Sequence, residues 1–290
     1  MSDYHVHLHP HTVGPGDPPP GEFSRELIER YVERATARGL AEVCFTEHLY
    51  RMREAGPVLG EFWLAEDPEV AAPSARFVLA QRQFSLESYV AAVVAARDFG
   101  LPVLLGLEVD YFPETIEQVS ELLAPYPWDL LLGSVHWIGG FAIDVADVAF
   151  EFERRGVARV YEEYFALETE LAGSGSVDVL AHVDVVKNHG HRLPEEAREL
   201  YGAVARAATA SGTAVEVSTA GLAEPCAELY PSPVFLGVLH EHGVGITLAS
   251  DAHRPDTVGR DFDLARRTAR EAGYSDRLEF RRRKSVAVPL

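Results

Sequence analysis

Four histidines stand at alternate positions near the start of the chain, in the segment MSDYHVHLHPH: His5, His7, His9 and His11. In an extended strand, residues two apart point to the same side of the backbone. His5 and His7 can therefore present two imidazoles to one ion, and imidazole is a common ligand of transition metals. The opening segment predicts a metal site at the end of a first strand.

Further ligand-type side chains stand at the ends of later apolar segments. A carboxylate that emerges from a run such as VLLGLE is costly to bury unless it is paired or bound to a metal. Asp251 and His253 in LASDAH are again two residues apart, which predicts that they share one face of a strand. The ligand-type residues of these later segments are His48, Glu108, His136, His182, Asp251 and His253.

Nitrogen and oxygen donors without a thiolate suit Zn²⁺, Mn²⁺ or Fe²⁺. At about four ligands per ion, and with one bridging carboxylate, the set is large enough for two or three divalent metal ions. Paired metals activate water and bind a phosphoryl group, so no serine or cysteine nucleophile is required. The sequence contains neither a P-loop nor a GxGxxG motif. The chemistry indicated is metal-assisted hydrolysis.

Short apolar segments alternate with segments of helical periodicity along the chain, which predicts parallel strands covered by helices. Almost every candidate strand ends in a ligand-type side chain, and in a closed barrel all these ends meet at one mouth. We therefore expect an α/β fold, a distorted TIM-like (β/α)7 barrel with the metal site at the C-terminal ends of its strands. The candidate strands lie in residues 4–9, 41–48, 102–112, 128–137, 177–186, 213–221 and 244–253.

Candidate helices lie between these strands, and four of them end at glycine, which suits a left-handed C-cap. The helices are expected in residues 24–39, 85–100, 115–126, 156–173, 194–212 and 261–273, and the four glycines are Gly39, Gly100, Gly212 and Gly273. We expect a single barrel domain over residues 1–290, with loop insertions near 10–23 and 54–80. The first insertion is rich in proline and glycine, and the second shows no clear period.

Composition excludes several function classes. Acidic residues outnumber basic ones by 45 to 26, and a formal charge of −19 disfavours binding to nucleic acid or to anionic membranes.

Two cysteines give no disulfide framework, and we expect Cys44 to be a buried thiol. No secretory signal and no run of about 20 apolar residues is present, so a cytoplasmic protein is predicted. The basic run in EFRRRKSVAVPL is expected to form surface ion pairs. The sequence leaves the oligomeric state open.

Taken in order, DYHVHLH, FTEH, GLEVD, GSVHW, LAHVD and SDAHRPDTVG resemble the motifs of the polymerase and histidinol phosphatase (PHP) superfamily over nearly the whole chain. HGHRLPEE, STAGL and ELYPSP resemble the histidinol-phosphatase branch. The resemblance implies a phosphomonoesterase that hydrolyses L-histidinol phosphate to L-histidinol and phosphate, in histidine biosynthesis. It also implies a metal-bridging hydroxide as the nucleophile.

The resemblance further implies three groups of metal ligands. The first group is His5, His7, Glu108 and Asp251. The second group shares Glu108 as a bridge and adds His136 and His182. The third group is His48, His253 and a histidine of the first loop. Family members usually place that last histidine after a Cys-Gly pair, which this sequence lacks. Both His9 and His11 are therefore candidates, and we prefer His11.

Two kinds of residue are expected to contact the substrate. Asp251 or His253 is a candidate for protonating the leaving alcohol, and the sequence does not choose between them. Arg192 and Arg254 are candidates for phosphate contact, because a guanidinium group matches the geometry of phosphate oxygens.

Other functions remain open at this stage. One alternative is that the substrate is a small phosphate ester other than L-histidinol phosphate. An amidohydrolase-type enzyme also uses a His-x-His first strand, but its frequent carbamylated lysine on strand four has no counterpart in WDLLLGSVHW. A nuclease function is disfavoured, because the strong negative charge of the chain would repel a nucleic-acid substrate. A protein that binds metal without catalysing a reaction is disfavoured, because the set of expected ligands is nearly complete.

Overall fold

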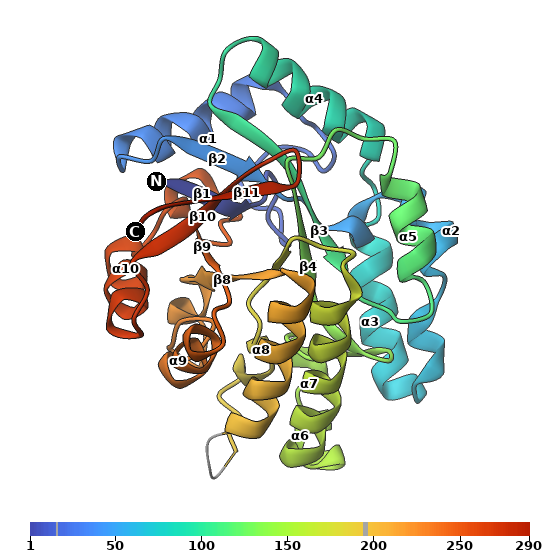
Figure 1. Ribbon diagram of the computed structural model, residues 1–290. Coiled ribbons are helices and arrows are strands. Elements are labelled where there is room, and N and C mark those ends of the chain that lie inside the picture. Colours follow the sequence, from blue (N-terminus) through green and yellow to red (C-terminus); the bar gives the residue numbers. More distant parts are fainter. Residues whose placement is uncertain (16, 194–196) are drawn as a thin grey trace.

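The computed structural model describes residues 1–15, 17–193 and 197–290, and its main sheet has seven parallel strands in the order β1-β2-β3-β4-β7-β8-β9. Their bounds are β1 Ser2–Val6, β2 Glu42–Phe45, β3 Val103–Asp110, β4 Leu130–Ser134, β7 Val179–Leu180, β8 Ala214–Ser218 and β9 Ile246–Ala249. Val6 forms a parallel bridge with Ala252, and the His7 amide donates to the Ala252 carbonyl at 2.7 Å. These contacts join the last strand to the first and nearly close the predicted barrel (Figure 1).

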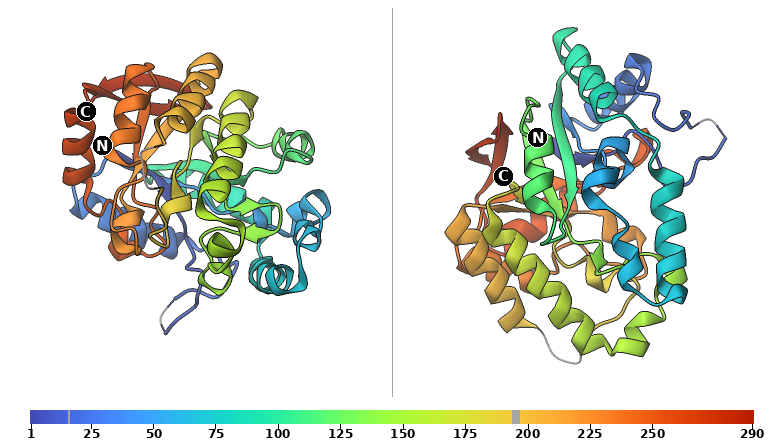
Figure 2. Two further views of the ribbon diagram at one scale, coloured as in Figure 1. Left: turned by 90° about the horizontal axis from the view of Figure 1, so that it is seen from below. Right: turned by 90° about the vertical axis from the view of Figure 1, so that its right-hand side faces the viewer.

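Helices surround this barrel (Figures 1 and 2). They include α1 Arg25–Ala37, α4 Leu86–Asp98, α5 Ile116–Leu123, α7 Val157–Ser174, α8 Arg198–Ser211, α9 Pro233–Glu241 and α10 Phe262–Glu271. The four glycines predicted to follow helices all have positive φ, from 75° at Gly39 to 110° at Gly273. Residues 194–196 of the helix expected over 194–212 lie outside the described residues. Helix α9 was not predicted, because its apolar sequence PVFLGVLHE shows no amphipathic period.

The segment expected as a loop over 54–80 is instead largely helical, with α2 Gly56–Leu59, α3 Pro68–Gln81 and short 3₁₀ turns. Pro57 and Pro68 stand in the first turns of these helices, where a missing amide hydrogen costs little. Ser74 of α3 donates to the Gly140 carbonyl at 2.6 Å. This bond attaches the segment to a small hairpin formed by β5 Trp137–Ile138 and β6 Phe141–Ala142. A short helix, α6 Glu151–Arg155, precedes α7.

A second hairpin, β10 Asp276–Arg281 with β11 Lys284–Pro289, covers the end of the barrel at which the strands begin. Its Phe280 packs inside the barrel and its amide donates to the Tyr4 hydroxyl at 2.9 Å. The barrel-interior cluster consists of Tyr4, Cys44, Leu104, Leu130, Leu132, Val179, Ala181, Ala214 and Phe280. Figure 2 shows this hairpin and the loop that contains residues 10–15 and 17–23 at opposite ends of the molecule. The sequence did not predict the hairpin.

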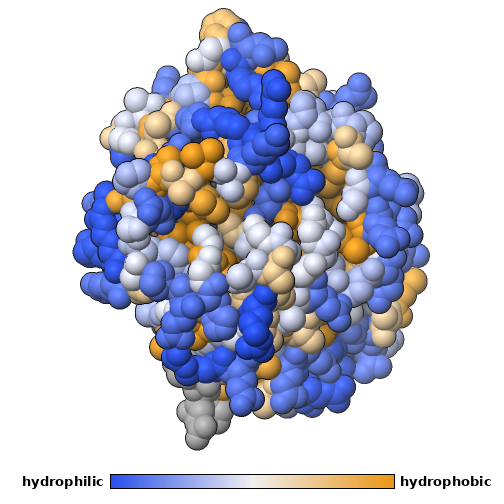
Figure 3. Space-filling model, viewed as in Figure 1, coloured by the Kyte–Doolittle hydropathy of each residue, from blue (hydrophilic) through white to orange (hydrophobic). Residues whose placement is uncertain are grey.

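The basic run at the tip of this hairpin forms the expected ion pairs. Arg283 lies 3.0 Å from Asp178, and Arg281 pairs with Glu42. On the face that carries the hairpin, hydrophilic side chains surround several separate hydrophobic patches (Figure 3). Both cysteines are buried free thiols. Within the described ranges, no helix has the length and apolar character needed to span a bilayer.

Candidate metal centre

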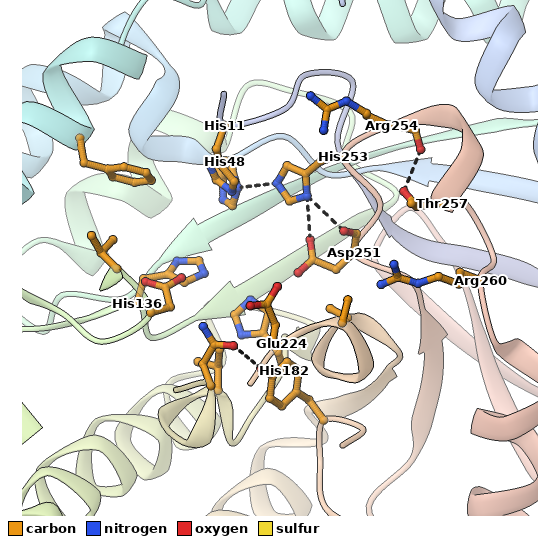
Figure 4. A pocket seen from close by; sticks show the side chains of 18 of the residues that line it. His11, His48, His136, His182, Glu224, Asp251, His253, Arg254, Thr257 and Arg260 are labelled. Atoms are coloured by element: carbon orange, nitrogen blue, oxygen red, sulfur yellow. Dashed lines mark hydrogen bonds and ion pairs between the residues drawn. The ribbon is translucent and has the colours of Figure 1, made fainter. Parts of the chain in front are cut away.

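The predicted ligand-type residues converge at the carboxyl ends of the strands, in a cavity of about 670 Å³ (Figure 4). Side chains from the ends of β1, β2, β3, β4, β7 and β9 lie in or beneath this cavity. Six of the expected residues line its wall: His11, His48, His136, His182, Asp251 and His253. His5, His7 and Glu108 are fully buried behind them.

The first expected ligand group forms a tight cluster. Nε2 of His5 lies 2.9 Å from Nε2 of His7, and the two nitrogens lie 3.6 and 3.3 Å from Oδ1 of Asp251. Oε2 of Glu108 lies 3.4 Å from the His5 nitrogen and 3.6 Å from the His7 nitrogen. Ligand atoms of a tetrahedral zinc ion are about 3.3 Å apart, so these spacings fit a shared ion.

Glu108 also lies at the centre of the second group. Its Oε1 is 3.0 Å from Nε2 of His182 and 3.4 Å from Nε2 of His136, while its Oε2 is 2.6 Å from Nδ1 of His48. One carboxylate therefore faces two groups of imidazoles, as a bridging ligand must.

The third group contains two of its three expected members at close range. Nε2 of His48 lies 3.4 Å from Nε2 of His253, and the His7 ring stacks on both imidazoles at 4.1 and 4.2 Å. The ring of His11 lies 4.4 Å from that of His253. His9 points elsewhere, because its ring packs against Phe23 and Phe84. Of the two candidate histidines, the structure therefore brings only His11 to the cavity.

Asp251 and His253 reach the cavity from a turn, whereas the sequence analysis expected them to share one face of a strand. Strand β9 ends at Ala249, and Asp251 has a φ of 51°, in the left-handed region. This region is sparsely populated by residues other than glycine. Buried Asp3 holds the turn in place, because its carboxylate accepts from the amides of Ser250 and Gly259 at 3.0 and 2.8 Å.

The electrostatic environment favours cations at this site. Burial alone would raise the pKa of Glu108, but the surrounding histidines lower it well below its ordinary value. Burial opposes protonation of His136, yet Glu108 and Asp110 outweigh it and raise the pKa of His136 to about 10. Buried oxygens normally find a hydrogen-bond partner, but within the described residues Oε2 of Glu108 and Oδ1 of Asp251 have none with suitable geometry, although imidazole nitrogens lie close to both. A divalent ion would satisfy both oxygens, so the residues fit the metals that the resemblance implies.

Carboxylates that the sequence analysis did not assign orient several of these imidazoles. Oε2 of Glu216 lies 2.9 Å from Nδ1 of His5, and Oδ1 of Asp110 lies 2.9 Å from Nδ1 of His136. Outer carboxylates of this kind fix the tautomer and orientation of metal-binding histidines. The signal for Glu216 was present, since it is an acid within the apolar strand TAVEVS, as Glu108 is in its own strand.

The structure separates the two arginines that were expected at the phosphate. Arg192 lies outside the cavity, where it donates to Glu228 and to the Cys226 carbonyl, both at 3.0 Å. With its guanidinium group engaged in these loop contacts, Arg192 does not join the described residues that line the cavity. Arg254 reaches the rim, but its Nη2 lies 2.7 Å from Asp17.

A third arginine, which the sequence analysis did not single out, lines the cavity. Arg260 stands beside Asp251 in Figure 4. Within the described part of the chain its Nε makes no hydrogen bond, although Oδ2 of Asp261 lies 3.8 Å from it. Its backbone is fixed, since the Thr219 hydroxyl donates to the Arg260 carbonyl at 2.8 Å. Its position seven residues after His253, within a turn-rich segment, gave no indication of its direction.

The fold is a nearly closed parallel barrel, and its histidines and carboxylates gather at the carboxyl ends of the strands. This combination places the protein among the barrel proteins with a metal-binding site at that end. The PHP domain model matches residues 21–220. The chain is 32% identical over 284 residues to a probable histidinol-phosphatase of Deinococcus radiodurans, covering 96% of both proteins. The chain belongs to the PHP family.

Other relatives extend this comparison. A histidinol-phosphatase of Lactococcus lactis is 23% identical over 96% of this chain and 93% of its own length. A crystal structure of histidinol phosphate phosphatase from L. lactis, complexed with zinc, L-histidinol and phosphate, superposes with a TM-score of 0.70, 21% identity and 98% coverage of both chains. A putative histidinol phosphatase of Listeria monocytogenes gives a TM-score of 0.71 at 19% identity, covering 91% of this chain and 99% of its own. These two structures share the fold.

Proposed function

We propose that this protein is a metal-dependent phosphomonoesterase that hydrolyses L-histidinol phosphate to L-histidinol and phosphate, as a cytoplasmic enzyme of histidine biosynthesis. The observation that carries the proposal is the 32% identity, over 96% of the chain, to a relative named as a probable histidinol-phosphatase. The convergence of the motif histidines and carboxylates in one cavity supports it, because that cavity contains the groups that such hydrolysis requires.

We propose two or three divalent ions, zinc, manganese or iron, as the cofactors. The first site uses His5, His7, Glu108 and Asp251, and the second uses Glu108, His136 and His182. His48 and His253 form the core of a third group, for which the resemblance implies a histidine of the first loop, and of the two candidates there we prefer His11. The close spacing of donor atoms in the set His5–His7–Asp251 supports the first site. The sets His48–Glu108–His136 and His7–His48–His253 join members of different groups, and they support a compact cluster of ions without separating the second site from the third.

Divalent ions held here would supply Lewis-acid chemistry, by neutralising phosphate charge and lowering the pKa of water. The chain's own residues orient the ligands and the substrate around them. Glu216 and Asp110 hold the rings of His5 and His136 in place. Arg260 directs a guanidinium group into the cavity, where it can bind a phosphoryl oxygen. Asp251 and His253 are the candidates for donating a proton to the oxygen of the leaving alcohol.

Two carboxylates of the cavity lining are available to the rest of the substrate. Asp144 and Glu224 both line the cavity, and burial raises the pKa of Glu224. Histidinol carries an ammonium group and an imidazole, and carboxylates bind both as hydrogen-bond acceptors. A cavity lined by an arginine and by these two carboxylates suits a small phosphate ester that carries a cationic group.

The amidohydrolase alternative is disfavoured by the positions of the lysines. The sequence contains only Lys187 and Lys284. Nζ of Lys187 is buried and lies 2.7 Å from Asp184 and 2.9 Å from Glu228. Lys284 begins β11, in the hairpin at the other end of the barrel. Neither is placed to bridge metal ions as a carbamylated lysine.

The test is steady-state phosphate release from L-histidinol phosphate after chelation and after defined addition of Zn²⁺, Mn²⁺ or Fe²⁺. We expect chelation to abolish turnover, metal addition to restore it, and unrelated phosphomonoesters to react at least about tenfold more slowly in kcat/KM, a difference of roughly 1.4 kcal/mol. Equal rates on unrelated esters would reduce the assignment to a general phosphatase. Activity that survives chelation would reject the metal mechanism.

A further inference from the structure

The one asparagine of the chain, Asn188, lies in the wall of the cavity and is almost fully buried. It follows the short 3₁₀ turn Val185–Lys187, which comes after β7. Its backbone is fixed on both sides, because its amide donates to the Val185 carbonyl at 2.8 Å and its carbonyl accepts from the Cys226 amide at 3.0 Å. The side chain therefore projects from a well-held position.

Tyr230 orients the amide group of this side chain. The Tyr230 hydroxyl donates to Oδ1 of Asn188 at 2.9 Å, and the Tyr230 backbone forms two hydrogen bonds with Ser218, at 2.6 and 3.0 Å. With the amide turned over, Nδ2 would face the hydroxyl, and the phenolic proton would have only the Cys226 sulfur, 3.5 Å away, as its acceptor. A thiol is a much weaker acceptor than an amide oxygen, so the observed orientation is favoured.

The amide nitrogen is the free end of this side chain. Within the described residues, Nδ2 of Asn188 makes no hydrogen bond, and it is not enclosed by protein atoms. Because Asn188 lines the cavity, this nitrogen can meet a molecule that is bound there. An amide NH2 group donates hydrogen bonds and does not accept them, so its partner must be an acceptor atom.

The two ends of the proposed substrate need different partners. The cationic end needs acceptors, which Asp144 and Glu224 provide, whereas the phosphoryl end needs donors. We propose that Asn188 donates through Nδ2 to a phosphoryl oxygen of the substrate, and that Tyr230 is a positioning residue that acts through Asn188. This inference rests on the proposed function, because it assigns the acceptor to a phosphate ester in this cavity.

Asn188→Asp isolates the donor, because it keeps an oxygen that accepts from Tyr230 and replaces the NH2 group with a second oxygen. Isothermal titration calorimetry of the zinc-loaded proteins with inorganic phosphate measures the effect. We expect Asn188→Asp and Asn188→Ala to bind phosphate about 10- to 100-fold more weakly. The zinc content of both variants, and the affinity of Asn188→Ala for L-histidinol, should be unchanged. An unchanged phosphate affinity in Asn188→Ala, a loss confined to L-histidinol, or a loss of zinc would overturn the proposal.

Tyr230→Phe tests the positioning role, because it removes the hydroxyl and leaves the amide of Asn188 in place. Phosphate affinity should fall about 3- to 10-fold, and the same change in the Asn188→Ala background should have no further effect. Tyr161→Phe is the matched control, since Tyr161 is also buried and its hydroxyl donates to the His191 carbonyl at 2.7 Å, three residues after Asn188. It should bind phosphate as the unmodified protein does. Equal losses from Tyr230→Phe in both backgrounds would contradict a role through Asn188.

Because the chain has one asparagine, nuclear magnetic resonance can observe the contact directly. In zinc-loaded protein labelled with ¹⁵N-asparagine, the side chain of Asn188 gives a single pair of NH2 proton signals. Inorganic phosphate should shift one proton of this pair downfield, and L-histidinol alone should shift it less. A pair that stays in place at saturating phosphate would refute the contact. Neither measurement depends on the identity of the ester, so failure of the histidinol phosphate assay would leave both results interpretable.

Discussion

The carboxylate of Glu216 lies 2.9 Å from Nδ1 of His5, although 211 positions separate the two residues in the sequence. Both side chains are fully buried. The contact holds the Nδ1 proton of His5 and directs its Nε2 lone pair toward His7 and Asp251. The same carboxylate accepts the backbone amide of His182 at 2.9 Å. Glu216 thus supports proposed ligands from two separate strands.

We predict that Glu216→Gln lowers the affinity for zinc by about 10- to 100-fold, because the amide orients His5 less firmly and sets an N–H against the His182 amide. Competition with a chromophoric chelator measures this affinity. Glu151→Gln is a matched control, since Glu151 is equally buried but pairs with Arg155, outside the cavity. Equal zinc affinity in the two variants would show that Glu216 has no orienting role.

Arg260 gives a second prediction, on substrate binding. Arg260→Ala should raise KM for the phosphate ester by about 10- to 100-fold, because a hydrogen bond to a charged group contributes roughly 1.5–3 kcal/mol. The loop should persist, because Thr219 bonds to the backbone carbonyl of Arg260 and not to its side chain. Steady-state kinetics measure the effect. Arg198→Ala, at an exposed pair with Glu241, is the control. An unchanged KM in Arg260→Ala would exclude phosphate contact.

The sequence predicted the seven parallel strands of the barrel. The reason is that buried parallel strands have continuous apolar runs, and almost every run here ends in or is followed by a ligand-type side chain. Parallel strands place their carboxyl ends at one rim, so the convergence of His5, Glu108 and His182 follows from topology alone. The pairing of the strands therefore did not need to be known in detail.

Features that depend on long-range direction were not predictable. Nothing local distinguishes Arg260, which lines the cavity, from Arg192, which does not, because loop conformation decides where each guanidinium group points. The choice between His9 and His11 likewise depends on contacts with Phe84 and Arg51, more than 30 positions away. The β10–β11 hairpin was missed because its polar, arginine-rich sequence pairs only with itself and buries Phe280 at one point.

A buried carboxyl group on α7 gives a prediction about pH. Burial raises the pKa of Glu168 well above its ordinary value, and among the described residues only the Tyr164 hydroxyl donates to its side chain, at 2.7 Å. A group whose pKa is raised on folding stabilises the protein below its unfolded pKa, near 4.5, and loses that contribution as the pH rises toward the folded pKa. The neutral isostere in Glu168→Gln avoids this loss.

Glu168→Gln should therefore become progressively more stable than the unmodified protein as the pH rises above about 4.5, by about 1.4 kcal/mol for each unit of the pKa shift. Urea unfolding at a series of pH values measures the difference. Glu162→Gln, at an exposed position of the same helix, should show no such trend. A difference that is constant with pH would mean that Glu168 ionises normally in the folded protein.

Phe280 gives a prediction that separates stability from metal binding. Its ring packs among the barrel-interior residues beside Tyr4, and only 4% of its surface is exposed. Phe280→Ala should lower the free energy of unfolding by about 3–5 kcal/mol, because it leaves a cavity at the end of the barrel where the strands begin. Val286→Ala on β11, where 65% of the side chain is exposed, should cost less than about 0.5 kcal/mol.

The proposed metal ligands lie at the opposite end of the barrel, so the zinc content of folded Phe280→Ala should be unchanged. Urea unfolding and metal analysis of the same samples test both statements, and a loss of zinc without a loss of stability would contradict them.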